Sequence, residues 1–241
     1  MNCFVRFLSA VTPPVITELG RKISARLSGK SDDKGRQYST VDDPQEVPCQ
    51  VEAYLFCRDN YLKPNDRVLE VGFGLGYGMQ IMAATVREIA GLDVDEKAFR
   101  RAGRIFAGHP VVKDIRLYDG RSFPFADKSF DAVTCLEVLE HVPDYLALLN
   151  EMARVSRRLV FISTPNRRPE YTLRSGKPKN FWHLREWSKS ELDAVFAGLN
   201  YRVEWNFLDG PFQGPFRVSR KENSETLTLM PAILVAQKSC L

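Results

Sequence analysis

The chain contains 241 residues, of which 44% are hydrophobic and 27% charged, and this content suffices for one domain with a complete core. Its formal net charge of +4 permits an anionic partner but does not require one, so composition does not indicate a nucleic-acid-binding protein. No stretch approaches the roughly 18 uninterrupted apolar residues of a membrane-spanning helix. The cysteines lack metal-binding or redox spacing and are odd in number, so we expect no disulfide framework and a reducing, cytoplasmic location.

The N-terminal part of the chain differs in character from the remainder. Residues 1–16 are apolar, but a pair of prolines within them would stop a helix after about two turns. Residues 29–48 are polar and charged, which is typical of a loop. We therefore predict a partly mobile N-terminal arm over residues 1–46 and one domain over residues 47–241. The apolar start either packs on that domain or lies on a membrane surface, so peripheral membrane contact stays open.

Apolar periodicity and turn residues predict helices and strands along the domain. Helices are expected over residues 47–62, 77–86, 96–106, 143–156 and 191–199, and strands over residues 68–71, 88–94, 111–118, 130–136, 159–163, 201–208 and 226–236. Strands alternate with helices until residue 200, and a loop over residues 209–225 then joins the last two strands. This order predicts an α/β fold with a doubly wound, mostly parallel sheet that is completed by an antiparallel C-terminal pair.

Two side-chain placements can be predicted from these elements. Asp95 is expected to cap the helix over residues 96–106, because its carboxylate can accept a hydrogen bond from an early backbone N–H. The helix over residues 143–156 is amphipathic. The side chains expected to face inward from it are Leu146, Leu149, Met152 and Val155.

The most informative stretch runs over residues 66–78, where a short apolar run is followed by glycine at every second position. Glycine can adopt positive φ and lets a ligand approach the bare backbone, and the next helix directs its N-terminal amides at that ligand. Strand, glycine loop and helix form the nucleotide cradle of a doubly wound sheet. The dinucleotide pattern needs a third glycine where this chain has Tyr77, and Glu70 would repel a pyrophosphate. The loop therefore suits a ligand with a positive centre and an amino group.

The spacing of Glu70 and the glycines after it, Glu-x-Gly-x-Gly-x-Gly, resembles motif I of the class I S-adenosylmethionine (SAM) methyltransferases. Asp93 ends the next strand, where a carboxylate accepts hydrogen bonds from both ribose hydroxyls in nucleotide-binding βαβ units. The stretch that begins at Asp119 is similar to the family segment whose acidic residue contacts the adenine amino group. The resemblance covers residues 66–142 and implies SAM as cofactor and a seven-stranded sheet with an antiparallel hairpin at one edge.

The resemblance also assigns the residues that hold the donor. Glu70 and the glycine loop would cradle its methionine end, Asp93 its ribose and Asp119 its adenine. The residues assigned to cofactor binding are Glu70, Gly72, Phe73, Gly74, Gly76, Asp93, Val94, Asp119, Gly120 and Glu137. Residues 163–167 and 183–188 resemble a bacterial branch of the family, many members of which accompany cell-surface glycan or lipid synthesis.

Glu137, Glu140 and His141 are spaced i, i+3 and i+4, so on a helical turn they would share one face. Two carboxylates and an imidazole can bind Mg²⁺, Mn²⁺ or a related ion. The triplet is similar to that of polyprenyl-quinone O-methyltransferases and small-RNA 2′-O-methyltransferases that use a metal. Many other family members carry Leu-Glu-His without a metal. We predict no metal here, with the metal-assisted mechanism as the alternative.

The residues assigned to catalysis are His183, His141 and Glu140. The methyl group of SAM is already activated by the sulfonium, so positioning supplies much of the rate. A general base adds roughly 10²–10⁴-fold where the acceptor must lose a proton. For His183 the sequence leaves three roles open, namely general base, metal ligand and structural contact at the edge of a lid.

Residues 164–190 are expected to form that lid over the acceptor, because they leave the fifth strand beside the predicted active site. Aromatic residues are interleaved there with an excess of basic over acidic ones. The basic residues are Arg167, Arg168, Arg174, Lys177, Lys179, Arg185 and Lys189. This composition favours an anionic acceptor and offers rings that can stack on a sugar or a base. The lid is predicted to be mobile without its acceptor.

These features predict a SAM-dependent methyltransferase that acts on an oxygen atom of a glycan, a glycolipid or a small metabolite, and not on nucleic acid. The alternative acceptor is a quinone precursor or an RNA 2′-hydroxyl, methylated with metal assistance. Two other classes stay open, a non-catalytic SAM-binding protein and an NAD-dependent oxidoreductase. The sequence does not indicate an oligomeric state.

Overall fold

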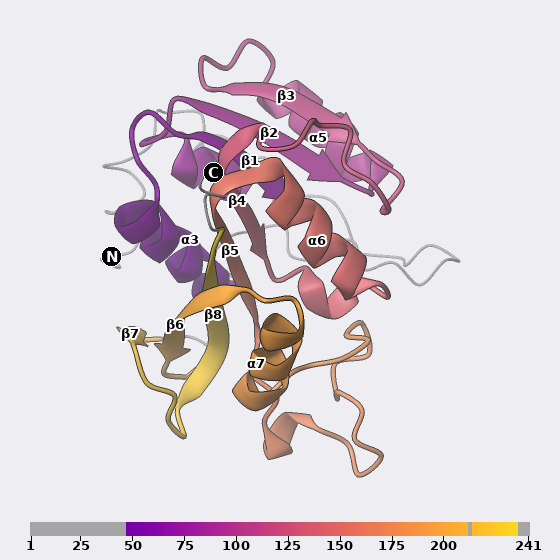
Figure 1. Ribbon diagram of the computed structural model, residues 1–241, viewed down its shortest axis with the longest axis vertical. Helices are drawn as coiled ribbons and strands as arrows, with labels where there is room; N and C mark the ends of the chain where they lie inside the picture. The colour runs from indigo at the N-terminus through magenta and orange to yellow at the C-terminus, as the bar shows by residue number, and fades with distance from the viewer. Residues whose placement is uncertain (1–46, 212–213, 236–241) are drawn as a thin grey trace, which may run out of the picture.

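The computed structural model describes residues 47–211 and 214–235 (Figure 1). The N-terminal arm predicted over residues 1–46 lies outside the described residues. Among the helices that are described, none is long and apolar enough to cross a membrane. Three cysteines fall within the described chain, and Cys49, Cys57 and Cys135 are all buried and free.

One eight-stranded sheet forms the centre of the molecule, in the order β3-β2-β1-β4-β5-β8-β6-β7. Its strands are β1 (Arg67–Val71), β2 (Glu88–Asp93), β3 (Val112–Leu117), β4 (Phe130–Leu136), β5 (Ser156–Pro165), β6 (Arg202–Asp209), β7 (Arg217–Ser219) and β8 (Thr226–Leu234). Strands β1 to β5 are parallel, with Val68 opposite both Ile89 and Ala132. Strand β8 is antiparallel to both β5 and β6. The predicted doubly wound, mostly parallel sheet with antiparallel C-terminal strands is confirmed.

The expected number of strands was too low by one. The segment over residues 209–225, predicted as a loop, contains β7, which pairs antiparallel with β6 through Phe207 and Ser219. Strand β7 has only three residues and none of them is buried. A strand this short at an edge carries no alternation of apolar and polar residues, and so it leaves no periodic pattern in the sequence.

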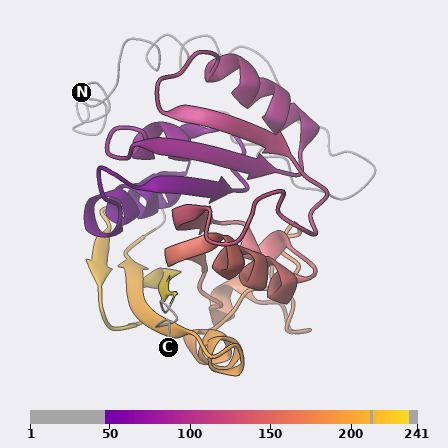
Figure 2. The ribbon, with the colours of Figure 1, turned by 45° about the horizontal axis from the view of Figure 1, so that its top comes forward.

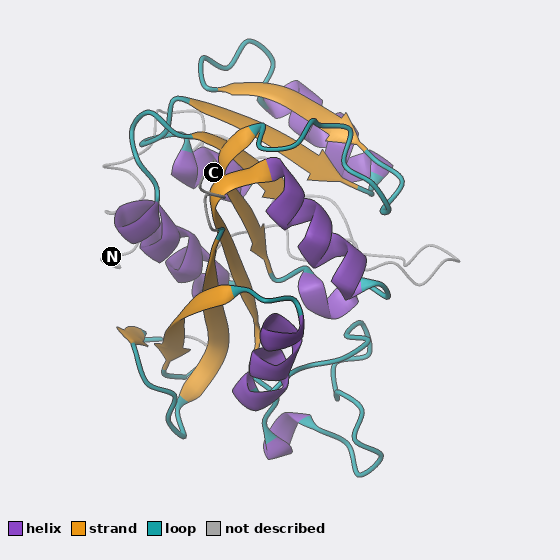
Figure 3. Cartoon of the chain, in the orientation of Figure 1, coloured by secondary structure: helices purple, strands orange, loops and turns teal. Residues whose placement is uncertain are grey.

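Helices cover both faces of the sheet (Figures 1 and 3). They are α3 (Pro48–Tyr61), α4 (Tyr77–Met82), α5 (Glu96–Ile105), α6 (Tyr145–Val155) and α7 (Lys189–Gly198), with short 3₁₀ turns η2 (Leu139–His141) and η3 (Pro169–Tyr171). Buried residues of α3, α4 and α5, among them Tyr54, Met79 and Ala102, pack in one cluster. Those of α6 and α7, among them Leu149 and Leu192, pack in the other. Two apolar layers therefore enclose the sheet.

Helix α6 differs from its predicted packing at one position. Leu146, which we expected to face inward, is 42% exposed. Leu148 takes a buried position instead, so the buried stripe consists of Leu148, Leu149, Met152 and Val155. By contrast, the predicted cap of α5 is confirmed, since the Asp95 carboxylate accepts a hydrogen bond from Lys97 N.

Candidate active site

The parallel strands point the same way, so their carboxyl ends meet at one edge of the sheet (Figure 2). Gly72 follows β1, Asp93 ends β2, Asp119 follows β3 and Glu137 follows β4. In doubly wound sheets ligands bind outside this edge. The fold therefore brings together residues with predicted functions that lie far apart in the sequence.

The glycine loop between β1 and α4 has the conformation that only glycine adopts easily. Gly72, Gly74 and Gly76 have φ of 73°, 49° and 83°. A Cβ atom at Gly72 would lie 2.4 Å from Val138 Cγ2, and Gly76 is the N-cap of α4. The backbone at Gly72 is thus in the left-handed region and closely packed, so a side chain there would strain the loop and displace its neighbour.

Beneath the loop lies Glu70, whose carboxylate is fully buried. Tyr54 of α3 donates a hydrogen bond from its hydroxyl to Glu70 Oε1 at 2.5 Å, while Glu70 Oε2 has no partner within the described chain. Burial raises the pKa of Glu70 to about 8, against the effect of the Tyr54 hydrogen bond. A buried carboxylate with an unpartnered oxygen beside a bare backbone loop fits a cationic ligand such as SAM.

We expect donor binding to be linked to proton release at Glu70. At pH 7 this carboxyl is mainly protonated, because its pKa is about 8. A cation bound nearby favours the ionised form, so binding should expel a proton, and affinity should rise as the pH approaches 8 from below and level off above it. Titration calorimetry in two buffers of different ionisation enthalpy measures the released proton. Glu70→Gln should lower the number of protons released per SAM bound. A binding enthalpy that does not depend on the buffer would contradict the linkage.

Asp93 is buried at the end of β2 and faces the glycine loop. Its Oδ2 accepts a hydrogen bond from Gly74 N at 2.8 Å, and its Oδ1 accepts one from Asp95 N at 2.9 Å. The carboxylate therefore ties β2 to the loop while each oxygen keeps a second lone pair. Ribose binding, predicted for this residue, would use those remaining lone pairs.

The other residues assigned to the cofactor differ in how they are placed. Phe73 is 2% exposed and packs against Gly91, so any contact with a donor would come from its backbone. Val94 lies beside Gly120, because a Cβ atom added to that glycine would lie 3.4 Å from Val94 Cγ1. Asp119 is exposed and accepts hydrogen bonds from Arg121 N and Ser122 N, which lower its pKa. Adenine contact by Asp119 stays a prediction.

The prediction that Glu137 shares a helical face with Glu140 and His141 is wrong. Only residues 139–141 form the 3₁₀ turn η2, and Glu137 precedes it with φ of 54° in the left-handed region. Glu137 accepts a hydrogen bond from Ser163 Oγ at 2.7 Å. The loop after β4 turns sharply to reach η2, so the sequence spacing does not translate into one helical face.

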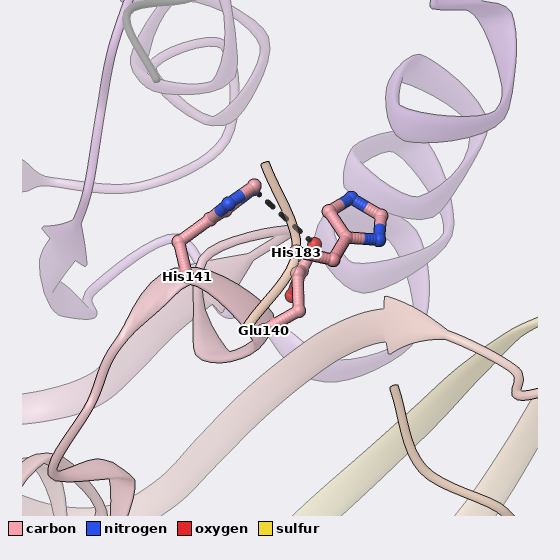
Figure 4. A group of neighbouring side chains, drawn as sticks. All are labelled: Glu140, His141 and His183. Atoms are coloured by element: carbon pink, nitrogen blue, oxygen red, sulfur yellow. Dashed lines mark ion pairs between the residues drawn. The ribbon is translucent and has the colours of Figure 1, made fainter. Parts of the chain in front are cut away.

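Glu140 and His141 nonetheless lie together (Figure 4). Glu140 is 1% exposed, its Oε2 accepts a hydrogen bond from Thr164 Oγ1, and its Oε1 lies 3.8 Å from His141 Nε2. Burial raises the pKa of Glu140 to about 8 and lowers that of His141. His141 Nδ1 lies 3.0 Å from the carbonyl oxygen of Trp182, which can only accept. Nδ1 therefore carries the proton, and Nε2 presents a lone pair.

His183 comes from the predicted lid and reaches the same place. Its ring lies 5.1 Å from that of His141, centroid to centroid. His183 Nδ1 lies 2.6 Å from Glu186 Oε1, and Nε2 lies 2.9 Å from the amide nitrogen of Asn180. Because the amide donates, Nε2 is the acceptor and Nδ1–H donates to the carboxylate. Glu186 and His183 form a carboxylate–imidazole pair with the lone pair on Nε2.

Sequence patterns did not indicate three residues that contact the predicted site residues. Glu186 is 7% exposed, and its Oε2 has no hydrogen-bond partner within the described chain. Asn180 and Tyr54 complete the environments of His183 and Glu70. Glu186 lies three positions after His183, and this i, i+3 spacing is the one sequence feature that could have indicated the pair.

The three residues Glu140, His141 and His183 could also hold a metal ion, since one ligand atom from each lies within 4.8 Å of the others. With metal–ligand distances of about 2.0–2.2 Å, two ligands of one ion can be at most about 4.4 Å apart. The residues would have to move closer, and His183 would have to exchange its contact with Asn180 if Nε2 were the ligand. The Asn180 contact occupies Nε2 of His183, so this nitrogen can act as a proton acceptor or as a metal ligand only after that contact is exchanged.

Comparisons with known proteins identify the family of this chain. Residues 69–161 match the model of a methyltransferase domain family. A probable SAM-dependent methyltransferase of Mycolicibacterium smegmatis is 36% identical over 141 residues, which are 57% of this chain and 52% of that protein. This chain thus spans about half the length of that relative. A ubiquinone biosynthesis O-methyltransferase of Xanthomonas campestris is 34% identical over 177 residues, which are 68% of this chain and 73% of that enzyme.

Among solved structures, a putative methyltransferase of Bacillus halodurans superimposes with a TM-score of 0.59 and 16% identity. The alignment covers 78% of this chain and 100% of that one. Because the identity is only 16%, the superposition shows a shared fold and not a shared function. Fold, glycine cradle and relatives together define a SAM-binding transferase. The chain belongs to the class I SAM-dependent methyltransferases, with SAM as cofactor. The oxidoreductase alternative is thereby set aside.

Proposed function

We propose that the chain transfers the methyl group of SAM to a hydroxyl oxygen of a glycan, a glycolipid or a small metabolite. The observation that carries this proposal is the Glu186–His183 pair, since an imidazole held by a buried carboxylate is suited to remove a hydroxyl proton. Bound SAM supplies a sulfonium-activated methyl carbon, to which the acceptor oxygen bonds while the carbon–sulfur bond breaks and its electron pair remains on sulfur. Nε2 of His183 would exchange its hydrogen bond from Asn180 for the acceptor hydroxyl and take that proton, and Glu186 would stabilise the resulting imidazolium.

The acceptor would approach from the side of residues 164–190. A cleft of about 660 Å³ opens there between η3 and the carboxyl end of β6, lined by Arg168, Tyr171, Asp209, Phe216, Arg217 and Leu227 among others. It combines aromatic rings with the guanidinium groups of Arg168 and Arg217 and the carboxylates of Asp209 and Glu225, which supports an acceptor that carries a ring and polar groups. Its lining includes neither the donor residues nor His183, so the acceptor would have to extend from this cleft to the donor methyl and His183.

Arg185, one of the basic residues expected to meet an acceptor, has a structural place instead. Its guanidinium lies over the rings of Tyr145, at 4.6 Å, and Trp187, at 5.9 Å, and donates a hydrogen bond to Pro143 O. Arg185 thus joins the lid to the start of α6, and we do not assign it to the acceptor.

The proposal is tested by transfer of a labelled methyl group from SAM to lipid, glycan and soluble metabolite fractions, each incubated with the purified chain. Label in an alkali-stable product, identified as an ether by mass spectrometry, would support O-methylation. Label on nitrogen, or SAM binding without transfer to any fraction, would contradict it. The latter outcome would favour the non-catalytic SAM-binding alternative.

The second candidate is metal-assisted O-methylation of a quinone precursor or an RNA 2′-hydroxyl. The cluster of Glu140, His141 and His183 favours it, as does the likeness to the Xanthomonas ubiquinone biosynthesis enzyme. In this mechanism the metal would lower the pKa of the acceptor hydroxyl.

We expect methyl transfer to survive exhaustive chelation, because both ring nitrogens of His183 already have partners, Nδ1 in Glu186 and Nε2 in Asn180. The measurement compares rates before and after treatment with EDTA and passage over a desalting column. A rate abolished by EDTA and restored by Mg²⁺ or Mn²⁺ would establish the metal-assisted mechanism instead.

A further inference from the structure

Within the part of the chain that the structure describes, exposed large apolar side chains concentrate in one short segment. The described chain has six exposed large hydrophobic residues, and four of them lie within residues 171–184. They are Tyr171, Leu173, Phe181 and Leu184, and Phe181 is 86% exposed. Scattered apolar residues are normal on a protein surface, but a cluster in one segment marks a contact surface.

The backbone holds this segment in a defined shape. Thr172 and Pro178 form an antiparallel bridge, Leu173 N donates to Lys177 O at 2.8 Å, and Lys179 N donates to Tyr171 O at 2.7 Å. Figure 1 shows the segment beyond α7, where it extends away from the sheet. Tyr171 and Leu173 therefore lie on a hydrogen-bonded hairpin over residues 171–179, and Phe181 and Leu184 lie on the stretch that leads from it back to η2.

Unpaired positive charge lies on the same hairpin. Arg174, Lys177 and Lys179 are exposed, and none of them has an ion-pair or side-chain hydrogen-bond partner within residues 47–211 and 214–235. No acidic residue occurs between Tyr171 and Arg185. Other basic residues of the lid are paired, as Arg167 is with Glu191 and Arg168 with Glu170. The excess charge thus coincides with the apolar cluster.

We infer that residues 171–184, which we call the docking hairpin, bind the surface of an anionic lipid bilayer. Its apolar side chains would enter the boundary between head groups and acyl chains, while its three unpaired cations would meet the anionic head groups. A soluble anionic partner would explain the cations but leaves Phe181 and Leu173 in water. A neutral apolar partner would explain those side chains but leaves the cations without counterions.

The docking hairpin is directly connected to the candidate active site. His183 lies within it, Leu184 N donates to Glu140 O at 2.9 Å, and Trp182 O holds His141 Nδ1. Docking would thus present the site to an acceptor carried by the membrane. Membrane binding goes beyond the proposed methyl transfer. Because vesicle binding can be measured without SAM or acceptor, a failure of membrane binding can be told apart from a failure of methyl transfer.

The test is flotation of the full chain with vesicles of phosphatidylcholine alone and of phosphatidylcholine mixed with phosphatidylglycerol. We expect binding to the mixed vesicles that weakens with salt. Two double variants should each bind the mixed vesicles about tenfold or more weakly than the unaltered chain. One is Leu173→Ser with Phe181→Ser, and the other is Lys177→Glu with Lys179→Glu. Leu117→Ser and Lys113→Glu, at exposed positions on β3 at the opposite edge of the sheet, serve as matched controls and should bind as the unaltered chain does.

Thermal unfolding and SAM titration of each variant check that it folds. Failure of the unaltered chain to float, or variants of the docking hairpin that float as well as the β3 controls, would overturn the inference. Equal binding to neutral and anionic vesicles would also overturn it, because the cations would then have no role. Variants that change the acceptor KM while vesicle binding is absent would show that the hairpin closes over its own site instead.

Discussion

Replacing His183 with alanine should lower kcat by about 10²–10⁴-fold and leave the affinity for SAM nearly unchanged. The expectation rests on the Glu186 carboxylate, which holds Nδ1–H and so places the lone pair on Nε2, where the acceptor hydroxyl would replace the Asn180 amide as donor. Without this imidazole a hydroxyl would have to attack in its protonated form. Single-turnover rates with saturating SAM measure the chemical step, and calorimetry measures donor affinity.

Two further variants make this test specific. Glu186→Gln keeps a hydrogen-bond acceptor for His183 but removes the charge that stabilises the imidazolium, so it should lose less rate than His183→Ala. His109→Ala is the matched control, since His109 accepts hydrogen bonds from Val111 N and Val112 N beside β3 and contacts no predicted site residue. Added imidazole should restore part of the rate to His183→Ala. A kcat within a few-fold of the unaltered chain, or a loss confined to His141→Ala, would contradict the assignment.

Replacing Asp93 with alanine should weaken SAM binding by about 100-fold or more. Hydrogen bonds to a charged group contribute about 1.5–3 kcal/mol each, and the carboxylate is expected to accept two from the ribose. The variant also removes the acceptor for Gly74 N, which anchors the glycine loop to β2. Loop order and ribose contacts would thus be lost together. Titration calorimetry with SAM and with S-adenosylhomocysteine measures the effect.

Asp95→Ala provides the control for Asp93, because it removes a neighbouring carboxylate that caps α5. It should lower stability by about 1 kcal/mol while SAM affinity changes only a few-fold. Equal SAM affinity in Asp93→Ala and the unaltered chain would remove Asp93 from the donor site. A preference for NAD over SAM in the unaltered chain would contradict the donor assignment as a whole.

Local patterns accounted for most of the fold. Strand β4 lies at Phe130–Leu136, as its apolar run predicted, and α3 and α5 lie within two residues of their expected bounds. These elements are encoded by periodicity and by caps, which depend on residues a few positions apart. Strand β7 and the exposure of Leu146 could not be predicted from such patterns, because each depends on what packs against it.

The sequence by itself determined the donor side of this protein. Glu70, the glycine loop and Asp93 lie in one strand–loop–helix–strand unit, so their spacing along the chain already implies their proximity. Only the tertiary structure brought together the residues to which we assign removal of the acceptor proton. His141 and His183 come together because residue 182, 41 positions after His141, is bound to its ring, and because Glu186 orients the second imidazole. The contact between His141 and residue 182 arises from packing of the lid against η2, and no local spacing in the sequence encodes it.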